Sequence, residues 1–557
     1  MSLRTLRASG VTPAEFAILG TVTLLVLWLV FYPTLWLGWA AFHKGAPGDT
    51  GPWTLDNFAL LFEGSYWRLV GRSLLVGVGI TVVATAIGVP LAWLTVKTDM
   101  PFKRLVELSA ILPFFTSTFI GGLAWIFLGN PTNGLLKLWF GLPVNVYSMS
   151  GIIWVTGIYM APYMFLFTAA ALRNMDTTYE EASFMCGASL WRTLSRITLP
   201  LILPALLSGM SLVLVISMGI FGVAAILGFP GKIVLLATEI YAKTVLTPPN
   251  YGTATVCGLT LMGITAALIV LQRWILRSGS YALVGGRGFR MKLYPLGKWT
   301  PVALTGCSLY ALLAVILPGL VLVKTSFQPY PTPKFGLWTV DNWTAFFEKA
   351  DLYQTLLRSL YLSTFGATFC VVLTAVIAYI IHRSNVPGRR LLEQVAVMPI
   401  GIPGIVMGLA MIWAYIVWPI WGSLWVLVIA YMTLFMPYGV RALGATIVQI
   451  HPELEESSRV HGASWLRTFW RVVMPLLRPG IYSTWILLFI IFIREISAAV
   501  LLTSINTRLF PVLIFEQWTE GYLNVMSAGA LLLSLIMLAV IGIFKWGFKV
   551  DLSPAYR

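Results

Sequence analysis

Charged side chains are scarce in this sequence. Only 10% of its 557 residues are Asp, Glu, Lys or Arg, whereas 58% are hydrophobic, and the mean hydropathy is +0.85. This composition excludes a water-soluble protein. The apolar stretches run for about 20 residues or more, the length of a membrane-spanning helix, while strands of a membrane barrel would give alternating segments of about 10. The sequence therefore predicts an all-α polytopic membrane protein.

Reactive and metal-binding side chains are also few. The four histidines are scattered over loops and helix ends, and none is accompanied by a nucleophile and an orienting acid. The cysteines show no pair spacing that would indicate a disulfide framework or a zinc site; they are Cys186, Cys257, Cys307 and Cys370. We therefore expect no catalytic residue, no metal site and no cofactor bound by this chain.

The phosphate-binding sequence G-x-x-x-x-G-K-[ST] is missing as well. The nearest run, Gly228 to Ile233, has the wrong spacing. If the protein uses ATP, another chain must bind it. Because the chain also lacks a histidine accompanied by a nucleophile and an orienting acid, an enzyme embedded in the membrane is disfavoured.

Twelve membrane helices are expected, six in each half of the chain. The ranges are 14–42, 69–96, 105–128, 151–172, 201–227 and 253–276, then 302–324, 359–381, 391–418, 423–446, 476–503 and 525–548. Residues 278–298, rich in Gly and Arg and without apolar periodicity, read as a linker between a first repeat (1–277) and a second repeat (299–557).

The net charge of +16 comes mainly from cations on alternate connections between these helices. The positive-inside rule makes that side cytoplasmic, with both termini there. The basic excess then reflects topology and contact with anionic lipid rather than nucleic-acid binding. The cations on this side include Lys97, Lys103 and Arg104, then Arg173, Arg192 and Arg196, then Arg383, Arg389 and Arg390, then Arg467, Arg471 and Arg478.

The two halves repeat one another. The segment Thr54-Leu55-Asp56-Asn57-Phe58 recurs as Thr339-Val340-Asp341-Asn342-Trp343, 285 positions later. Arg72-Ser73-Leu74 recurs 286 positions later, and Pro162-Tyr163 recurs 275 positions later, so the first half carries 11 extra residues between its third and fourth helices. Halves with six helices each have parallel topology, related by an axis along the membrane normal, and a substrate path would lie between them.

A longer motif stands between the fourth and fifth helices of each half. The first copy is Glu180-Glu181-Ala182-Ser183-Phe184-Met185-Cys186-Gly187-Ala188, followed by Ile197-Thr198-Leu199-Pro200. The second copy is Glu455-Glu456-Ser457-Ser458-Arg459-Val460-His461-Gly462-Ala463, followed by Val472-Val473-Met474-Pro475. Glycine and proline are 13 positions apart in both copies. Helix formers and carboxylates open each segment, and small residues leave a surface onto which another protein can pack.

This pattern resembles the EAA loop of type I ABC importer permeases, E-A-A-x-x-x-G followed at a fixed distance by I-x-L-P. The resemblance implies a permease fold with two fused halves and a short coupling helix in each half. ATPase coupling would involve Glu181, Ala182 and Gly187 in the first copy and Glu456, Ser457 and Gly462 in the second. It also implies two copies of a cytoplasmic ATPase that binds ATP and Mg, an extracytoplasmic substrate-binding protein, and a location in the bacterial cytoplasmic membrane.

The T-x-D-N-[FW] segment and the fused length are most like the ferric iron group of this family. Thiamine, aminoethylphosphonate and sugar-phosphate importers are alternatives within it. A secondary transporter or channel is an alternative from another class, but it would leave the paired motif without a purpose. The motif would otherwise be an amphipathic helix lying on the lipid surface.

One charged pair interrupts the apolar run of the eleventh expected helix. Arg494 and Glu495 are costly inside a membrane unless they face a cavity or a partner, and the matching positions of the first half are Gly219 and Ile220. The pair is therefore a candidate for the translocation path, with a structural ion pair near the outer interface as the alternative. On a continuous helix the two side chains would point about 100° apart, so we expect at most one of them to contact substrate.

Overall fold

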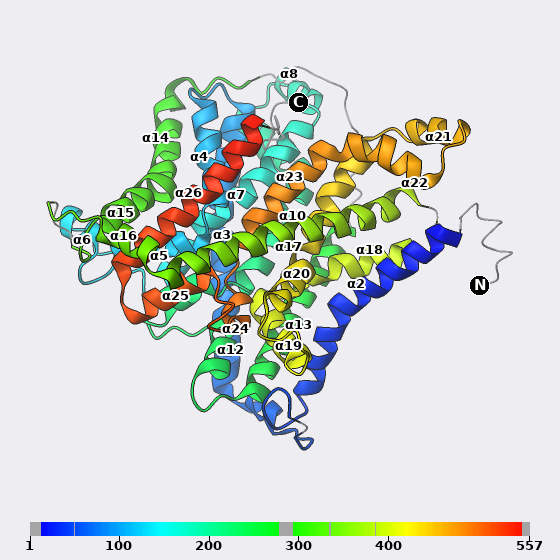
Figure 1. The fold of residues 1–557 in the computed structure, drawn as a ribbon. Coiled ribbons are helices and arrows are strands. Elements are labelled where there is room, and N and C mark those ends of the chain that lie inside the picture. The colour runs from blue at the N-terminus through cyan, green and yellow to red at the C-terminus, as the bar shows by residue number, and fades with distance from the viewer. Residues whose placement is uncertain (1–12, 50, 278–292, 333–335, 385, 548–557) are drawn as a thin grey trace.

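The computed structural model describes residues 13–49, 51–277, 293–332, 336–384 and 386–547. These residues form a helical bundle without extended strands in the described ranges (Figure 1). Ten of their helices are long and apolar enough to cross a membrane, and the number rises to twelve if two sharply bent helix pairs each count as one span. The expected set of about twelve membrane helices is confirmed.

The first half is built from five long helices and several short ones. The long helices are α2 (Pro13–Ala40), α3 (Gly64–Lys97), α7 (Met149–Asn174), α10 (Leu199–Met218) and α13 (Tyr251–Arg277). The short ones are η1 (Asp56–Phe62), α4 (Lys103–Phe115), α5 (Thr118–Gly129), α6 (Leu135–Phe140), α8 (Thr178–Met185), α9 (Leu190–Thr193), η2 (Leu194–Thr198), α11 (Gly222–Gly228) and α12 (Leu236–Val245).

The second half repeats this order after a 3-10 turn, η3 (Gly297–Trp299). Its first span is α14 (Thr300–Ala311), the π-turn η4 (Leu312–Ile316) and α15 (Leu317–Ser326); the other long helices are α17 (Ala350–Arg383), α20 (Leu424–Gln449), α23 (Met474–Ile493) and α26 (Leu523–Gly547). The short elements are α16 (Asp341–Glu348), α18 (Arg389–Val397), η5 (Met398–Gly401), α19 (Gly404–Tyr415), α21 (Glu453–Val460), α22 (Trp465–Thr468), η6 (Phe469–Val473), α24 (Ala499–Leu502) and α25 (Phe510–Glu520). Of the expected linker, residues 278–292 lie outside the described ranges.

Four of the expected helices are interrupted. The third is split into α4 and α5, which meet at 101°, and the ninth is split between η5 and α19 at 109°. Ser117 begins α5 by accepting a hydrogen bond from Phe119 N, and Pro403 directly precedes α19. The fifth and eleventh helices end at Met218 and Ile493, and short helices α11 and α24 follow them. The sequence stays apolar across every break, so it predicted a single helix at each of the four places. That prediction was wrong there.

The first helix of each half packs on the opposite half. α2 lies along α18 and α19, and α15 packs against α5 (Figure 1). The Tyr32 hydroxyl donates to the Ala414 carbonyl at 3.2 Å and accepts from Trp418 Nε1 at 3.0 Å. The two halves are therefore held together by the first helix of each, which packs on the other half.

The repeated T-x-D-N segment holds the end of this first helix. The Asn57 side-chain amide donates to the carbonyls of Ala41 and His43 at 3.0 and 2.9 Å. Asn342 does the same to Ser326 and Gln328 at 2.9 and 2.7 Å. Both asparagines are buried, so the motif is a structural clamp that satisfies carbonyls beyond a helix terminus.

This clamp gives a prediction for stability. Asn342→Asp keeps the size of the side chain but replaces the donor facing two carbonyls by an acceptor, while the bond that Asn342 Oδ1 accepts from Asn524 at 2.7 Å is retained. We expect the unfolding free energy to fall by about 2 kcal/mol or more, because two buried carbonyls lose their donors. Thermal denaturation of the detergent-solubilised protein measures this, with Asn133→Asp in an exposed loop as the control. Equal melting temperatures for the two variants would contradict the clamp.

Candidate functional site

The two motif copies form matching short helices at one end of the molecule, which we call the loop end. α8 and α21 lie there, while α12 lies at the opposite end (Figure 1). α8 begins after Asp176, whose carboxylate accepts from Thr178 N at 2.9 Å. Hydrogen bonds from the Thr178 side chain and backbone lower the pKa of the Asp176 carboxyl. α21 begins directly after Pro452.

A glycine in the left-handed region ends each of these helices. Gly187 has φ +77° and Gly462 has φ +79°. The chain then turns back, with Ala188 N donating to the Ser183 carbonyl at 3.1 Å and Ala463 N to that of Ser458 at 3.2 Å. The glycines are therefore helix caps in the first place. No atom lies within 4 Å of a Cβ built on either one, so both also leave open space.

The chain enters α10 and α23 through identical π-turns. η2 and η6 occupy residues 194–198 and 469–473, 275 positions apart, directly before Pro200 and Pro475. A proline that follows a helical turn cannot supply the N–H of a regular α-helix, and a π-turn accommodates that loss. The sequence placed these prolines at the start of a new helix, whereas the structure continues one helix through them from Leu190 to Met218.

The two glutamates of each motif have different environments. Glu181 and Glu456 are exposed, whereas Glu180 and Glu455 are buried. Glu180 forms an ion pair with Lys97 at 2.9 Å, and Glu455 with Arg383 at 3.3 Å. The exposed members, Glu181 and Glu456, are the ones predicted from the motif. The repeat contained a signal for the buried member, since Lys97 and Arg383 are basic residues at the ends of equivalent helices, α3 and α17, 286 positions apart.

Large apolar side chains cover the exposed faces. Tyr179 and Met185 on α8 are 52% and 89% exposed, and Leu454 and Val460 at the matching positions of α21 are 48% and 85% exposed. Ala182 and Ser457 lie exposed between them. An exposed apolar surface flanked by a carboxylate is typical of a protein-binding face, and here it occurs twice.

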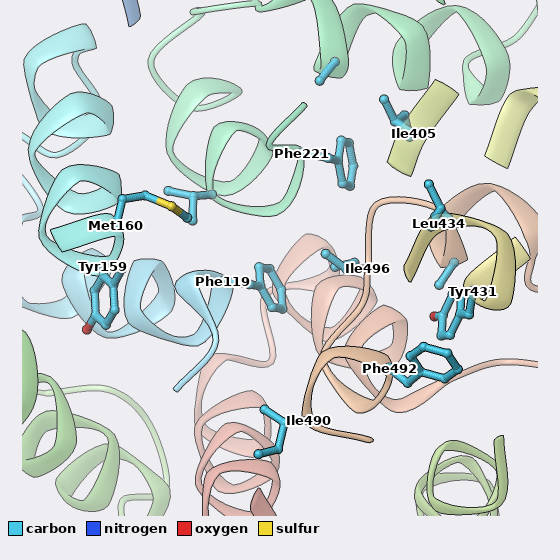
Figure 2. Close-up of a cluster of buried hydrophobic side chains, with 14 of the residues drawn as sticks. Phe119, Tyr159, Met160, Phe221, Ile405, Tyr431, Leu434, Ile490, Phe492 and Ile496 are labelled. Carbon is cyan, nitrogen blue, oxygen red and sulfur yellow. The ribbon is translucent and has the colours of Figure 1, made fainter. Parts of the chain in front are cut away.

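A second feature is a cavity at the junction of the two halves, which we call the central cavity. About 200 Å³ is open there to water-sized molecules. All four helix breaks contribute to its lining. The lining residues there are Thr116, Ser117 and Thr118, then Gly219, Ile220 and Gly222, then Ile400, Ile402, Pro403 and Gly404, then Arg494, Glu495, Ile496 and Ser497. Figure 2 shows part of the apolar cluster around it, including Phe119 of α5 and Ile496, which follows α23. Both of these side chains pack against Gly222.

Arg494 and Glu495 lie at this cavity, just beyond the end of α23. The Arg494 guanidinium donates to the Phe114 carbonyl of the other half and lies 5.4 Å from the centre of the Phe114 ring. Glu495 Oε1 accepts from Ala498 N at 3.0 Å, just before α24 begins at Ala499. Neither residue is inside a helix, so the separation of about 100° between neighbours on a helix does not apply, and both line the cavity. That at most one of them contacts substrate stays a prediction.

Arg494 has no equivalent in the first half, and the reason is steric. Gly219 and Ile220 occupy the matching positions and line the same cavity. A Cβ at Gly219 would lie 2.9 Å from Pro403 Cβ, so no larger side chain fits there. By contrast Tyr163 and Tyr438, which match across the repeat, both line the cavity. Among the described residues, no group of three or more His, Cys, Asp or Glu side chains is arranged to hold a metal ion.

Comparison with known proteins gives a consistent result. The family model of binding-protein-dependent transport system inner membrane components matches residues 84–278 and 370–547. The chain is 25% identical over 548 residues to the ferric transport system permease protein FbpB of Actinobacillus pleuropneumoniae, covering 94% of this chain and 77% of that protein. It is also 25% identical to a putative ferric transport system permease protein of Haemophilus influenzae, over 88% of this chain and 78% of that protein. A solved bacterial ABC transporter involved in alginate import aligns over 46% of this chain and 98% of its own, with a TM-score of 0.38 and 14% identity.

The helix-capping glycines give a second prediction. Gly187→Ala forces a side chain into the left-handed region, which costs about 1 to 2 kcal/mol, and Gly187→Asn should cost less. We expect faster hydrogen exchange of the α8 amides in the alanine variant. Gly263→Ala within α13 is the matched control, because that glycine has open space and no positive φ. If both alanine variants leave α8 exchange unchanged, the capping role is wrong.

Proposed function

Because the chain belongs to the family of binding-protein-dependent transport system inner membrane components, we propose that it forms the translocation path of an ABC importer for ferric iron. It is a multi-pass inner-membrane permease and not an enzyme. A binding protein outside the cytoplasm delivers the iron, and two copies of a separate ATPase, which hold ATP and Mg, drive its transport.

The similarity to ferric permeases carries the assignment of iron. It extends over 94% and 88% of the chain, so it includes both halves and the central cavity. Ferric iron is a hard cation that prefers oxygen donors. The cavity offers the Glu495 carboxylate and the hydroxyls of Tyr163 and Tyr438. These groups support passage of such an ion without forming a closed metal site.

The matched faces of α8 and α21 support the ATPase. Each half presents two exposed apolar residues and one exposed glutamate at equal spacing, which fits two copies of one partner. The excess of cations at the loop end supports a cytoplasmic location for it by the positive-inside rule, and we propose that both termini lie on the same side. The ATPases then bind beneath the two halves, and the binding protein docks at the α12 end.

The docking surface gives a third prediction. Met185→Glu together with Val460→Glu places a charge in the centre of each interface. We expect ATPase binding to weaken by about tenfold or more, because each buried apolar side chain contributes about 1.5 to 3 kcal/mol. Co-purification with the ATPase measures this.

Ile505→Glu is the control for this change, since Ile505 is 76% exposed and lies between α24 and α25, away from α8 and α21. Normal ATPase binding by the Met185 and Val460 double variant would argue against these faces as the interface. Uptake of substrate by the permease alone in liposomes would contradict the ABC importer assignment as a whole.

The central cavity gives a fourth prediction. Arg494→Ala and Glu495→Ala should each slow binding-protein-dependent uptake of ferric iron, by about tenfold for Glu495→Ala, since a hydrogen bond to a charged group is worth about 1.5 to 3 kcal/mol. Ile220→Ala lines the same cavity from the other half and should transport normally.

Membrane insertion and basal ATP hydrolysis are measured in parallel with these uptake rates. Normal uptake by both charge variants would leave the pair with a structural role only. Uptake of thiamine, aminoethylphosphonate or a sugar phosphate instead of ferric iron by the unaltered protein would reject iron and keep the permease.

A further inference from the structure

Two buried ion pairs occupy equivalent places in the two halves. Lys97 Nζ lies 2.9 Å from Glu180 Oε2, with side chains 1% and 3% exposed. Arg383 Nε lies 3.3 Å from Glu455 Oε1, with side chains 11% and 8% exposed. The cations are 286 positions apart and the glutamates 275, which are the offsets of the surrounding repeats. Lys97–Glu180 joins the last turn of α3 to α8, and Arg383–Glu455 joins the last turn of α17 to α21.

The remaining hydrogen bonds to these glutamates are not repeated. Thr198 donates its hydroxyl to Glu180 Oε1 at 2.6 Å, and the position matching Thr198 is Val473. The Tyr379 hydroxyl donates to Glu455 Oε2 at 2.8 Å, and the position matching Tyr379 is Trp93. Among these contacts of the described residues, the ion pair is the one found in both halves. A buried ion pair is weak evidence for stability, since its desolvation offsets much of its attraction. Its presence twice, with different neighbours, favours a role in linking the two elements.

The basic ends of α3 and α17 are held firmly by other contacts. The Lys97 carbonyl accepts from Tyr294 N at 2.8 Å, and the Tyr294 ring packs 5.5 Å from that of Phe184 on α8. Burial and the nearby Glu180 charge raise the pKa of the Tyr294 phenol. In the second half, Arg383 donates to the carbonyls of Ile447 at 2.8 Å and of Ile450. The basic residue of each ion pair therefore also contacts a further segment of the chain.

The other ends of α3 and α17 hold the short helices opposite the loop end. Ser73 Oγ accepts from Leu236 N, the first residue of α12, at 2.9 Å. Ser359 Oγ accepts from Phe510 N, the first residue of α25, at 2.7 Å. Each of α3 and α17 has 34 residues, about 50 Å of helix. One continuous helix thus connects each loop helix to a short helix across the molecule.

We propose that the ion pairs Lys97–Glu180 and Arg383–Glu455 transmit movement of α8 and α21 to α3 and α17. The hydrogen bonds that Ser73 and Ser359 accept then transmit this movement to α12 and α25. The four charged residues are positioning residues that couple the ATPase to the face where a loaded binding protein docks. This rests on the proposed function, since it requires an ATPase bound at α8 and α21.

The test removes the charges without leaving one buried and unpaired. Lys97→Met with Glu180→Gln, combined with Arg383→Met and Glu455→Gln, keeps side-chain size and leaves each glutamine able to accept from Thr198 or Tyr379. In proteoliposomes with the ATPase and the binding protein, we expect normal ATPase binding and basal hydrolysis. Stimulation of hydrolysis by the loaded binding protein, and uptake, should fall by about tenfold, a typical coupling between distant sites.

Two further variants separate coupling from folding. Lys97→Glu with Glu180→Lys exchanges the charges and should restore much of the lost stimulation in the first half. Arg173→Met with Glu107→Gln removes a 2.8 Å ion pair between α7 and α4, which does not touch α8, and should leave coupling intact.

Normal stimulation in the neutral variant would overturn the proposal, and so would an equal loss in the Arg173 and Glu107 control. If the neutral variant fails to insert, the variant with exchanged charges, Lys97→Glu with Glu180→Lys, becomes the test. If that variant inserts but the loaded binding protein does not stimulate its ATP hydrolysis, the proposal is contradicted. Failure of the unaltered permease to bind an ATPase would instead reject the proposed function.

Discussion

The lack of water inside a bilayer constrains every part of this structure. A backbone N–H or C=O left unpaired in hydrocarbon costs several kcal/mol, so a chain may leave the helical conformation only where protein or a water-filled cavity surrounds it. The four breaks obey this rule, because all of them border the central cavity. Ser117 caps α5, and the Glu495 carboxylate accepts from the Ala498 N–H between α23 and α24. The same constraint that requires long helices therefore concentrates irregular backbone, polar groups and charge on the axis between the halves.

Comparison of equivalent positions in the two halves separates residues with a shared structural role from residues that differ between the halves. Asn57 and Asn342 make the same pair of hydrogen bonds, and Ser73 and Ser359 cap equivalent helices. A contact that recurs in both halves in this way serves the fold that the halves share. The T-x-D-N segment is of this structural kind and carries no information on substrate. Arg494 departs from the repeat, since Pro403 leaves no room for more than glycine at position 219.

Much of the fold could be predicted from sequence because hydropathy and repetition report on burial and topology. The helix count, the two halves and the paired loop helices follow from these signals. The breaks could not be predicted, since the residues around Arg494 stay apolar through the end of α23 and into α24. The ion pairs could not be predicted from the sequence either, because Lys97 and Glu180 are 83 positions apart. Adjacent glutamates on a helix point about 100° apart, so only the fold shows that Glu180 is buried and Glu181 exposed.

The charges in the central cavity join both halves. Arg494 belongs to the second half, but its hydrogen bond and its ring contact are to Phe114 at the end of α4 in the first. Glu495 is fixed within its own half, by Ala498 N and by the Tyr431 hydroxyl that donates to its carbonyl at 3.1 Å. A movement that parts the halves would release Arg494 from Phe114 while leaving Glu495 in place. In the proposed transport of ferric iron, the electrostatic field in the cavity would therefore depend on how the two halves are arranged, which is what an alternating-access cycle would change.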